Sequence, residues 1–187
     1  MLDIFLVNGI AYVVGAIPVG YCIARICGID NITTQGSGNI GATNVARLLG
    51  ARFFLLVFFL DALKAWAVIF WIKGVGCSPC VISIASASLL VGNGCSLFLR
   101  GKGGKGVATA AGIYAAIQPH LFFVFGLVWG ASLFITKTAG VASLVTMLVM
   151  PVVTYFSMPP FIALSCAISC WVIYRHKNNF QKMLGKK

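Results

Sequence analysis

The feature that most constrains this chain is a series of apolar runs, each close to the length of one helical membrane crossing. Five of these runs lie at about residues 4–24, 53–72, 81–99, 139–157 and 160–174. A helix needs about 20 apolar residues to cross the hydrocarbon core of a bilayer. Charged residues make up only 9% of the chain, whereas soluble domains carry about 25%. The sequence therefore predicts an all-α membrane protein with no room for a sizeable soluble domain.

A further apolar run, residues 106–135, is either one long helix or two shorter helices broken at Gln118-Pro119. The distribution of charge decides, because lysine and arginine concentrate in the cytoplasmic loops of membrane proteins. If there are two helices, nearly all loop cations share one side and the other side keeps Lys73 alone. We therefore predict seven transmembrane helices, with the N-terminus outside and the C-terminus in the cytoplasm.

The whole chain, residues 1–187, is then expected to form a single polytopic domain. Its predicted cytoplasmic parts are the loops at about 25–52, 100–106 and 136–138 and the tail 175–187.

One of these loops, Arg100-Gly-Lys-Gly-Gly-Lys-Gly-Val-Ala-Thr109, places three cations and four glycines in seven residues. Successive backbone N–H groups in a glycine-rich loop can form an anion-binding concavity. A helix that opens at Gly106 would aim the positive end of its dipole at the same point. The loop therefore predicts a phosphate cradle, although a basic loop of this kind is also typical of a segment that only fixes membrane topology.

The loop 25–52 contains a second glycine-rich string, Gln35-Gly-Ser-Gly-Asn-Ile-Gly-Ala-Thr-Asn44. We expect it to run into a short helix near Ala42–Leu49, on which Asn44 and Arg47 would share one face. Both glycine strings match Gly-x-Gly-x-x-Gly. Neither follows a soluble strand or has an acid about 20 residues further on, so a dinucleotide site is rejected. Two cationic or polar glycine loops on one membrane face instead predict a site for two phosphates.

Two pairs of residues allow more than one interpretation. Asp61 and Lys64 lie inside an apolar run, where charged groups are costly and seldom idle. They form either a structural ion pair that tethers helices or a pair of which one member reaches the active cavity. Cys77 and Cys80 lie in a predicted outer loop, where a disulfide is possible. No pattern predicts a metal or an organic cofactor.

The strings Gly36–Asn44 with Arg47, and Lys102–Thr109, resemble the PlsY family, the acyl-phosphate-dependent glycerol-3-phosphate acyltransferases of bacterial membranes. The tail Arg175-His-Lys-x-Asn179 and the string Leu60-Asp-x-Leu-Lys64 are similar to further patterns of that family. The resemblance runs from about residue 16 to about residue 182. It implies a multi-pass protein of the bacterial cytoplasmic (inner) membrane, with seven spans and the motif loops on the cytoplasmic side.

This chain departs from the family pattern in three places. The family usually has Gly-His-x-x-Pro-x-Phe before its second glycine motif, whereas here Asn93 and Ser96 occupy the His and Pro positions. Gly101 stands where an aromatic residue is usual, and the string Thr138–Ser143 keeps little of a third motif. The absent histidine leaves open the rate and the donor preference that these changes would produce.

The resemblance implies transfer of a fatty acyl group from acyl phosphate to the 1-hydroxyl of glycerol 3-phosphate, which gives lysophosphatidic acid in the first acylation of phospholipid biosynthesis. The implied partners are the two substrates, the lipid bilayer and, transiently, the enzyme that makes acyl phosphate, with no role for nucleic acid. We predict direct attack by the glycerol hydroxyl, because acyl phosphate has a good leaving group and no inner loop offers a Ser-His-Asp arrangement. The donor's own phosphate or a water would accept the proton.

Each site residue has an expected role. Arg47 and Lys105 would bind phosphates, the glycines would offer backbone N–H groups, and His176 and Asn179 would bring the tail to glycerol phosphate. The predicted catalytic residues are Ser37, Asn39, Thr43, Arg47 and Lys105. The predicted substrate-binding residues are Gly38, Gly41, Asn44, Lys102, Gly103, Gly104, His176 and Asn179.

Two other functions are compatible with the sequence. The basic loops could form the vestibule of a small-anion transporter or channel, although transporters typically show repeats and broken helices near the bilayer midplane. A non-enzymatic lipid-binding or scaffold protein is the other alternative, and only the changes at Asn93 and Ser96 favour it.

Overall fold

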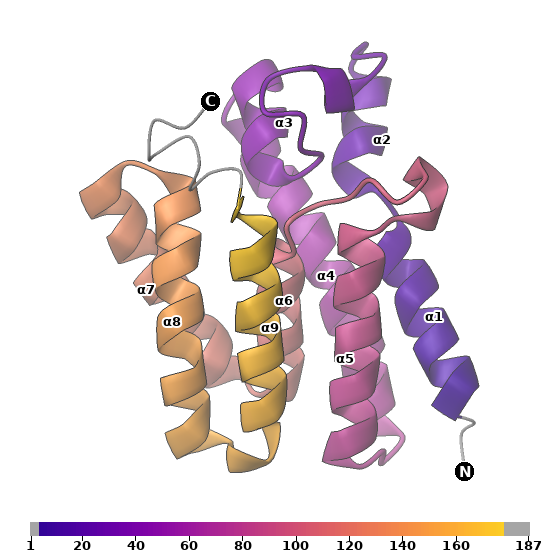
Figure 1. The fold of residues 1–187 in the computed structure, drawn as a ribbon, viewed down its shortest axis with the longest axis vertical. Helices are drawn as coiled ribbons and strands as arrows, with labels where there is room; N and C mark the ends of the chain where they lie inside the picture. Colours follow the sequence, from indigo (N-terminus) through magenta and orange to yellow (C-terminus); the bar gives the residue numbers. More distant parts are fainter. Residues whose placement is uncertain (1–3, 178–187) are drawn as a thin grey trace.

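The computed structural model describes residues 4–177, which form a bundle of helices joined by loops and contain no β-strand (Figure 1). This confirms the all-α prediction. The α-helices are α1 (Ile4–Ala16), α2 (Val19–Ile26), α3 (Ala42–Leu49), α4 (Arg52–Gly74), α5 (Pro79–Gly94), α6 (Val107–Ile117), α7 (Pro119–Thr136), α8 (Ala139–Ser157) and α9 (Ile162–Arg175). Three short 3₁₀-helices are η1 (Ile32–Thr34), η2 (Leu97–Leu99) and η3 (Pro159–Phe161).

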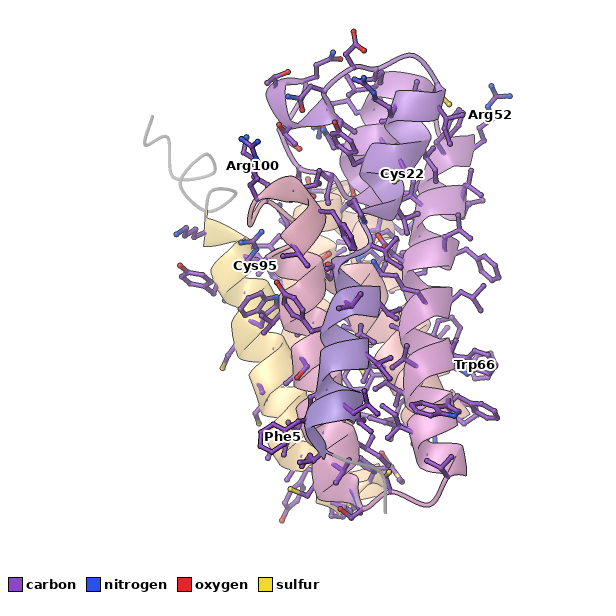
Figure 2. All side chains as sticks on the ribbon, turned by 90° about the vertical axis from the view of Figure 1, so that its right-hand side faces the viewer. Phe5, Cys22, Arg52, Trp66, Cys95 and Arg100 are labelled. Atoms are coloured by element: carbon purple, nitrogen blue, oxygen red, sulfur yellow. The ribbon has the colours of Figure 1, made fainter. Side chains whose placement is uncertain are left out.

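Five apolar helical segments within the described residues are long enough to cross a membrane. They are Ile4–Ile26, Arg52–Gly74, Pro79–Leu99, Pro119–Thr136 and Ala139–Ser157. Two shorter apolar segments, Val107–Ile117 and Pro159–Arg175, lie among them. Outward-facing aromatic residues agree with a lipid environment: Trp66, which Figure 2 shows pointing away from the bundle, stacks on Phe70 with ring centroids 4.8 Å apart.

The predicted break in the run 106–135 is confirmed. Helix α6 ends at Ile117, Gln118 has extended backbone angles (φ −160°, ψ 125°), and Pro119 begins α7. A second break was not predicted. The apolar run that begins at residue 4 forms two helices, because Pro18 has no backbone N–H with which to continue the helical hydrogen bonds.

Helix pairs approach closely where a glycine removes a side chain from the contact. A Cβ atom added to Gly15 of α1 would lie 2.1 Å from the Leu89 carbonyl oxygen of α5, and one added to Gly92 of α5 would lie 2.2 Å from the Tyr12 oxygen. At Gly112 of α6 the same atom would lie 2.0 Å from the Ala62 oxygen of α4. Small residues at such contacts are typical of membrane helices, whose backbones pack closely.

The loops that carry the sequence motifs lie at one end of the bundle (Figure 1). This end holds the connection from α2 through α3 to α4, the segment before α6 and the turn between α7 and α8. The opposite end holds the start of α1 and the turns α4–α5 and α8–α9. Both glycine strings are therefore brought to the same end of the molecule.

Candidate active site

A cavity of about 510 Å³, which we call the main cavity, opens at the loop end of the bundle. Both glycine strings and the end of α9 contribute to its wall. The predicted site residues that line it are Ser37, Asn39, Gly41, Thr43, Asn44, Arg47, Gly104, Lys105 and His176. The structure therefore brings together residues that lie more than a hundred positions apart in the sequence.

A second space of about 480 Å³, which we call the basic hollow, adjoins the main cavity. Its wall includes Lys102, Lys105, Arg175 and Lys177, together with the predicted residues Gly38 and Gly103. Three residues, Ser37, Asn39 and Lys105, line both spaces. These three form a shared wall, which has a polar hydroxyl, an amide and a cation facing two neighbouring volumes.

The first glycine loop is held in shape by Asn44, which is only 2% exposed. The Asn44 Oδ1 atom accepts a hydrogen bond from the Ser37 N–H (2.8 Å) and from Arg47 Nη1 (3.3 Å). Its Nδ2 group donates to the Gln35 carbonyl (3.0 Å). The predicted proximity of Asn44 and Arg47 on α3 is confirmed. In this structure, however, the Asn44 amide bonds to the loop itself, so it shapes the site, whereas a direct hydrogen bond to substrate had been expected.

The backbone N–H groups of three predicted glycines also have partners within the protein. Gly38 donates to the Gln35 carbonyl (2.9 Å), Gly41 to Asn39 Oδ1 (2.8 Å) and Gly104 to the Asn93 carbonyl (2.8 Å). The expectation that these three donors face a phosphate is therefore wrong for this conformation. Buried backbone groups must find hydrogen-bond partners, and in such short loops the nearest partners belong to the loops themselves or to the helices behind them.

The second glycine loop is held by Arg175, a residue that was not predicted as part of the site. Its guanidinium donates to the carbonyls of Gly103 (3.2 Å) and Gly104 (3.1 Å and 3.3 Å). The loop also packs directly on the end of α5, since a Cβ atom at Gly103 would lie 2.3 Å from the Gly94 oxygen. The tail string that contains Arg175 was the only sequence signal for this contact.

Helix α6 begins directly after the second loop, as predicted. Gly106 is its N-cap residue with φ +89°, a left-handed conformation that favours glycine. Lys105 and the first residues of α6 line the main cavity. Thr109 lies on the same turn, and its buried hydroxyl has no hydrogen-bond partner among the described residues. A helix N-terminus with an adjacent cation favours binding of an anion.

His176 lies at the end of α9 and is 2% exposed. Its Nδ1 atom is 2.8 Å from the Val172 carbonyl, and because a carbonyl can only accept, Nδ1 must carry the proton. Burial, and then the nearby charge of Lys105, lower the pKa of His176 to about 4. The ring is therefore neutral at pH 7, and its Nε2 atom is a hydrogen-bond acceptor. Asn179 lies outside the described residues.

One wall of the main cavity is apolar and was missed by sequence reasoning. Phe54 stacks on Phe58 (5.9 Å between centroids) and on Trp129 (5.7 Å). The Trp129 Nε1–H group donates to Ser143 Oγ (3.1 Å), so the weak third motif also reaches this wall. These aromatic residues lie in apolar runs, where a lipid-facing or core position is the usual expectation.

The Asp61 and Lys64 side chains form an ion pair with 2.7 Å between Oδ1 and Nζ. Asp61 lines the main cavity, and Lys64 also bonds to backbone carbonyls of the first helical segment. The pair therefore tethers helices, as the first interpretation expects, and Asp61 also reaches the main cavity. Cys77 and Cys80 are free thiols in this structure.

Comparison with known proteins gives a consistent result. The sequence model of the family described as glycerol-3-phosphate acyltransferase matches residues 5–186. A glycerol-3-phosphate acyltransferase of Thermosipho melanesiensis is 38% identical over 176 residues, which cover 94% of this chain and 86% of that protein. The protein of the same name from Aquifex aeolicus is 35% identical over 177 residues, covering 93% and 92%.

Solved structures agree with the sequence relatives. The crystal structure of PlsY, an integral membrane glycerol 3-phosphate acyltransferase, in its glycerol 3-phosphate form superposes with a TM-score of 0.90 at 31% identity. That match covers 98% of this chain and 94% of the other. The lysophosphatidic acid form of PlsY gives a TM-score of 0.89.

Proposed function

The chain belongs to the PlsY family of glycerol-3-phosphate acyltransferases, and from this premise we propose that it moves a fatty acyl group from acyl phosphate to the 1-hydroxyl of glycerol 3-phosphate. The product is lysophosphatidic acid, and the reaction is the first acylation in phospholipid synthesis. The observation that carries this proposal is the pair of adjoining spaces with a shared wall of Ser37, Asn39 and Lys105. Transfer of an acyl group from one phosphorylated substrate to another requires two anion sites side by side.

The same proposal includes the membrane topology. Residues 1–187 form one domain in the cytoplasmic (inner) membrane, with seven helical crossings, the N-terminus outside and the C-terminus in the cytoplasm. The placement of the basic loops at one end of the bundle supports this topology. Helix α6 has 11 residues and is only about 16 Å long, against about 30 Å for the hydrocarbon core. Its largely buried surface supports a crossing completed by the loop before it, since irregular backbone is tolerated in a membrane where protein surrounds it.

The roles of the side chains follow from where they lie. Arg47 and Lys105 neutralise phosphate charge in the main cavity, and Lys102 does so in the basic hollow. The side chains of Ser37, Asn39 and Thr43 donate hydrogen bonds. The glycines at 38, 41, 103 and 104 let the loops adopt this shape. His176 accepts a hydrogen bond from a glycerol hydroxyl through Nε2, and Asn179 is proposed as a further substrate-binding residue of the tail.

The reaction is a direct acyl transfer. The 1-hydroxyl oxygen attacks the acyl carbonyl carbon, the bond from that carbon to the phosphate oxygen breaks, and the departing phosphate or a water takes the hydroxyl proton. The cations stabilise the negative charge on the tetrahedral oxyanion and on the leaving phosphate. Holding both substrates in adjoining spaces lowers the activation free energy further, because the reacting groups are already close together and oriented. The aromatic wall of Phe54, Phe58 and Trp129 receives the first carbons of the acyl chain.

The decisive experiment uses purified protein in lipid nanodiscs with synthetic acyl phosphate and labelled glycerol 3-phosphate. We expect labelled lysophosphatidic acid from acyl phosphate and none when acyl coenzyme A replaces it. Product from acyl coenzyme A alone would contradict the proposed donor. Flux of glycerol 3-phosphate into sealed vesicles without any acylated product would support the transporter alternative.

A further inference from the structure

The break between α1 and α2 leaves three consecutive carbonyl groups without their normal helical partners. Pro18 offers no N–H group, and Val19 donates to the Ile17 carbonyl (3.1 Å) instead of to Gly15. In a continuous helix the carbonyls of residues 15–17 would accept from residues 19–21. Val19 supplies a donor to the Ile17 carbonyl alone, and unpaired carbonyls in a membrane protein are costly, so other donors must reach this point.

Two side chains from elsewhere in the chain provide these donors. Lys64 of α4 donates to the carbonyls of Gly15 (3.1 Å) and Ile17 (2.7 Å). The Ser96 hydroxyl, which is 1% exposed, donates to the Ala16 carbonyl (2.5 Å). Asp61 balances the charge of Lys64 from one helical turn away. All three carbonyls of the break are therefore bonded by residues far away in the sequence.

The segments that meet at the break are each connected to one of the two glycine loops. Ser96 anchors the turn that carries the second loop, since its N–H donates to Lys102 (3.3 Å) and its carbonyl accepts from Gly101 (2.9 Å). On the other side, the break is followed by α2, which packs against the first loop. A Cβ atom at Gly20 of α2 would lie 2.0 Å from the Ile40 oxygen, so α2 and this loop are in direct contact.

We propose that the break at Ile17–Pro18 is the joint that fixes the two glycine loops relative to each other, and that Lys64 and Ser96 are the positioning residues that hold it. The inference rests on the proposed function, in which both loops contribute to one site for two substrates. Neither Lys64 nor Ser96 lines the main cavity or the basic hollow, so each acts through the backbone that it bonds.

The chain supplies a matched control for each residue. Lys73, also on α4, donates to the carbonyls of Ala116 (3.4 Å) and Ile117 (2.8 Å) at the Pro119 break, at the end of the bundle away from the loops. Ser86 is buried on α5, and its hydroxyl donates within its own helix, to Ile82 (2.8 Å). If these residues stabilised the fold and nothing more, Lys64 would behave like Lys73 and Ser96 like Ser86.

The test compares Lys64→Met with Lys73→Met and Ser96→Ala with Ser86→Ala in nanodiscs. The first readout is hydrogen–deuterium exchange of peptides that cover residues 35–41 and 100–106. The second is kcat and KM for both proposed substrates.

For Lys64→Met we expect faster exchange in both loops and a fall in kcat of about tenfold or more, because misplacement of substrates by about 1 Å can cost 10²-fold. Ser96→Ala should give the same pattern at about threefold, Lys64→Arg should restore protection, and the two controls should leave the exchange of both loops unchanged.

Several results would overturn the proposal. Unchanged loop exchange in Ser96→Ala would do so, as would equal effects from Lys64→Met and Lys73→Met. If Lys64→Met does not fold, the Ser96→Ala and Ser86→Ala pair decides alone. If the wild-type protein makes no product from acyl phosphate, the proposed function fails, whereas the exchange comparison still decides whether Lys64 and Ser96 hold the loops.

Discussion

The two glycine loops reach the same cavity but are held in different ways. Asn44, Asn39 and Gln35 hold the first loop with hydrogen bonds that span no more than nine residues. The second loop is held by Asn93 of α5, by Ser96 just after that helix, and by Arg175 of α9, which lies more than seventy residues away. The first loop takes its internal hydrogen bonds from its own sequence and its place from the contact with α2, whereas the second takes its shape from the assembled bundle.

The largest expected effect tests whether the two cations that line the main cavity are needed for turnover. Arg47→Ala and Lys105→Ala should each lower kcat/KM by about 10²–10³-fold, equivalent to about 3–4 kcal/mol, as for the loss of an oxyanion donor. The measurement is turnover of acyl phosphate in nanodiscs. Arg100→Ala is the control, because this exposed cation of the second loop lines neither space. Normal turnover in either cavity variant would refute the assigned role.

The next largest effect is expected from a substitution in α3 that loosens the first glycine loop. Asn44→Ala removes an acceptor for two donors and a donor to the Gln35 carbonyl, and leaves buried groups unpaired at about 1–3 kcal/mol. We expect kcat/KM to fall by about 30-fold, with faster amide exchange confined to residues 35–41. Asn44→Asp keeps the acceptor oxygen and should lose less activity. Faster exchange in residues 100–106 as well would contradict local encoding.

Substitution of Arg175 should affect the second glycine loop. Arg175→Lys cannot reproduce a planar fork that bonds two successive carbonyls. A loss of about 1–1.5 kcal/mol, typical of one hydrogen bond, corresponds to about tenfold in kcat/KM. The expected increase in exchange is at residues 100–106 and not at 35–41. An Arg175→Lys protein with normal activity and normal exchange would mean that α5 alone holds this loop.

The smallest expected effect is the pH dependence of protein stability that His176, beside the second loop, contributes. Its pKa falls from 6.5 in the unfolded chain to about 4 in the folded protein. The unfolded chain therefore binds more protons between these values, and stability is lost as pH falls from about 6.5 to about 4. At pH 5.5 the loss from this group is about 1 kcal/mol relative to pH 7.5. Thermal unfolding in detergent should show this loss in wild type and a smaller one in His176→Gln; equal losses would contradict a neutral, buried ring.

The contrast between the loops also explains what could be predicted from the sequence. Helix α3 and the start of α6 follow from local signals, and both were found where the glycine strings placed them. The arrangement around Gly104 did not follow, because its N–H and carbonyl groups are engaged by α5 and by Arg175. No local pattern specifies such partners.

The prolines show the same limit of prediction from sequence. Pro18 and Pro119 mark breaks, whereas Pro151 lies inside the continuous helix α8. At both breaks a lysine of α4 reaches the carbonyls that lose their helical partners. Whether a proline ends a membrane helix thus depends in part on donors from elsewhere in the fold, which a single stretch of sequence does not reveal.

The wall shared by Ser37, Asn39 and Lys105 has a kinetic consequence. Inorganic phosphate released by the proposed reaction carries the same charged group as both substrates, so either space can retain it, and one cation then serves two occupants. By-product inhibition by phosphate should therefore be competitive against acyl phosphate and against glycerol 3-phosphate alike, and Lys105→Ala should weaken it toward both. An enzyme built in this way would slow its own turnover wherever phosphate accumulates near the membrane.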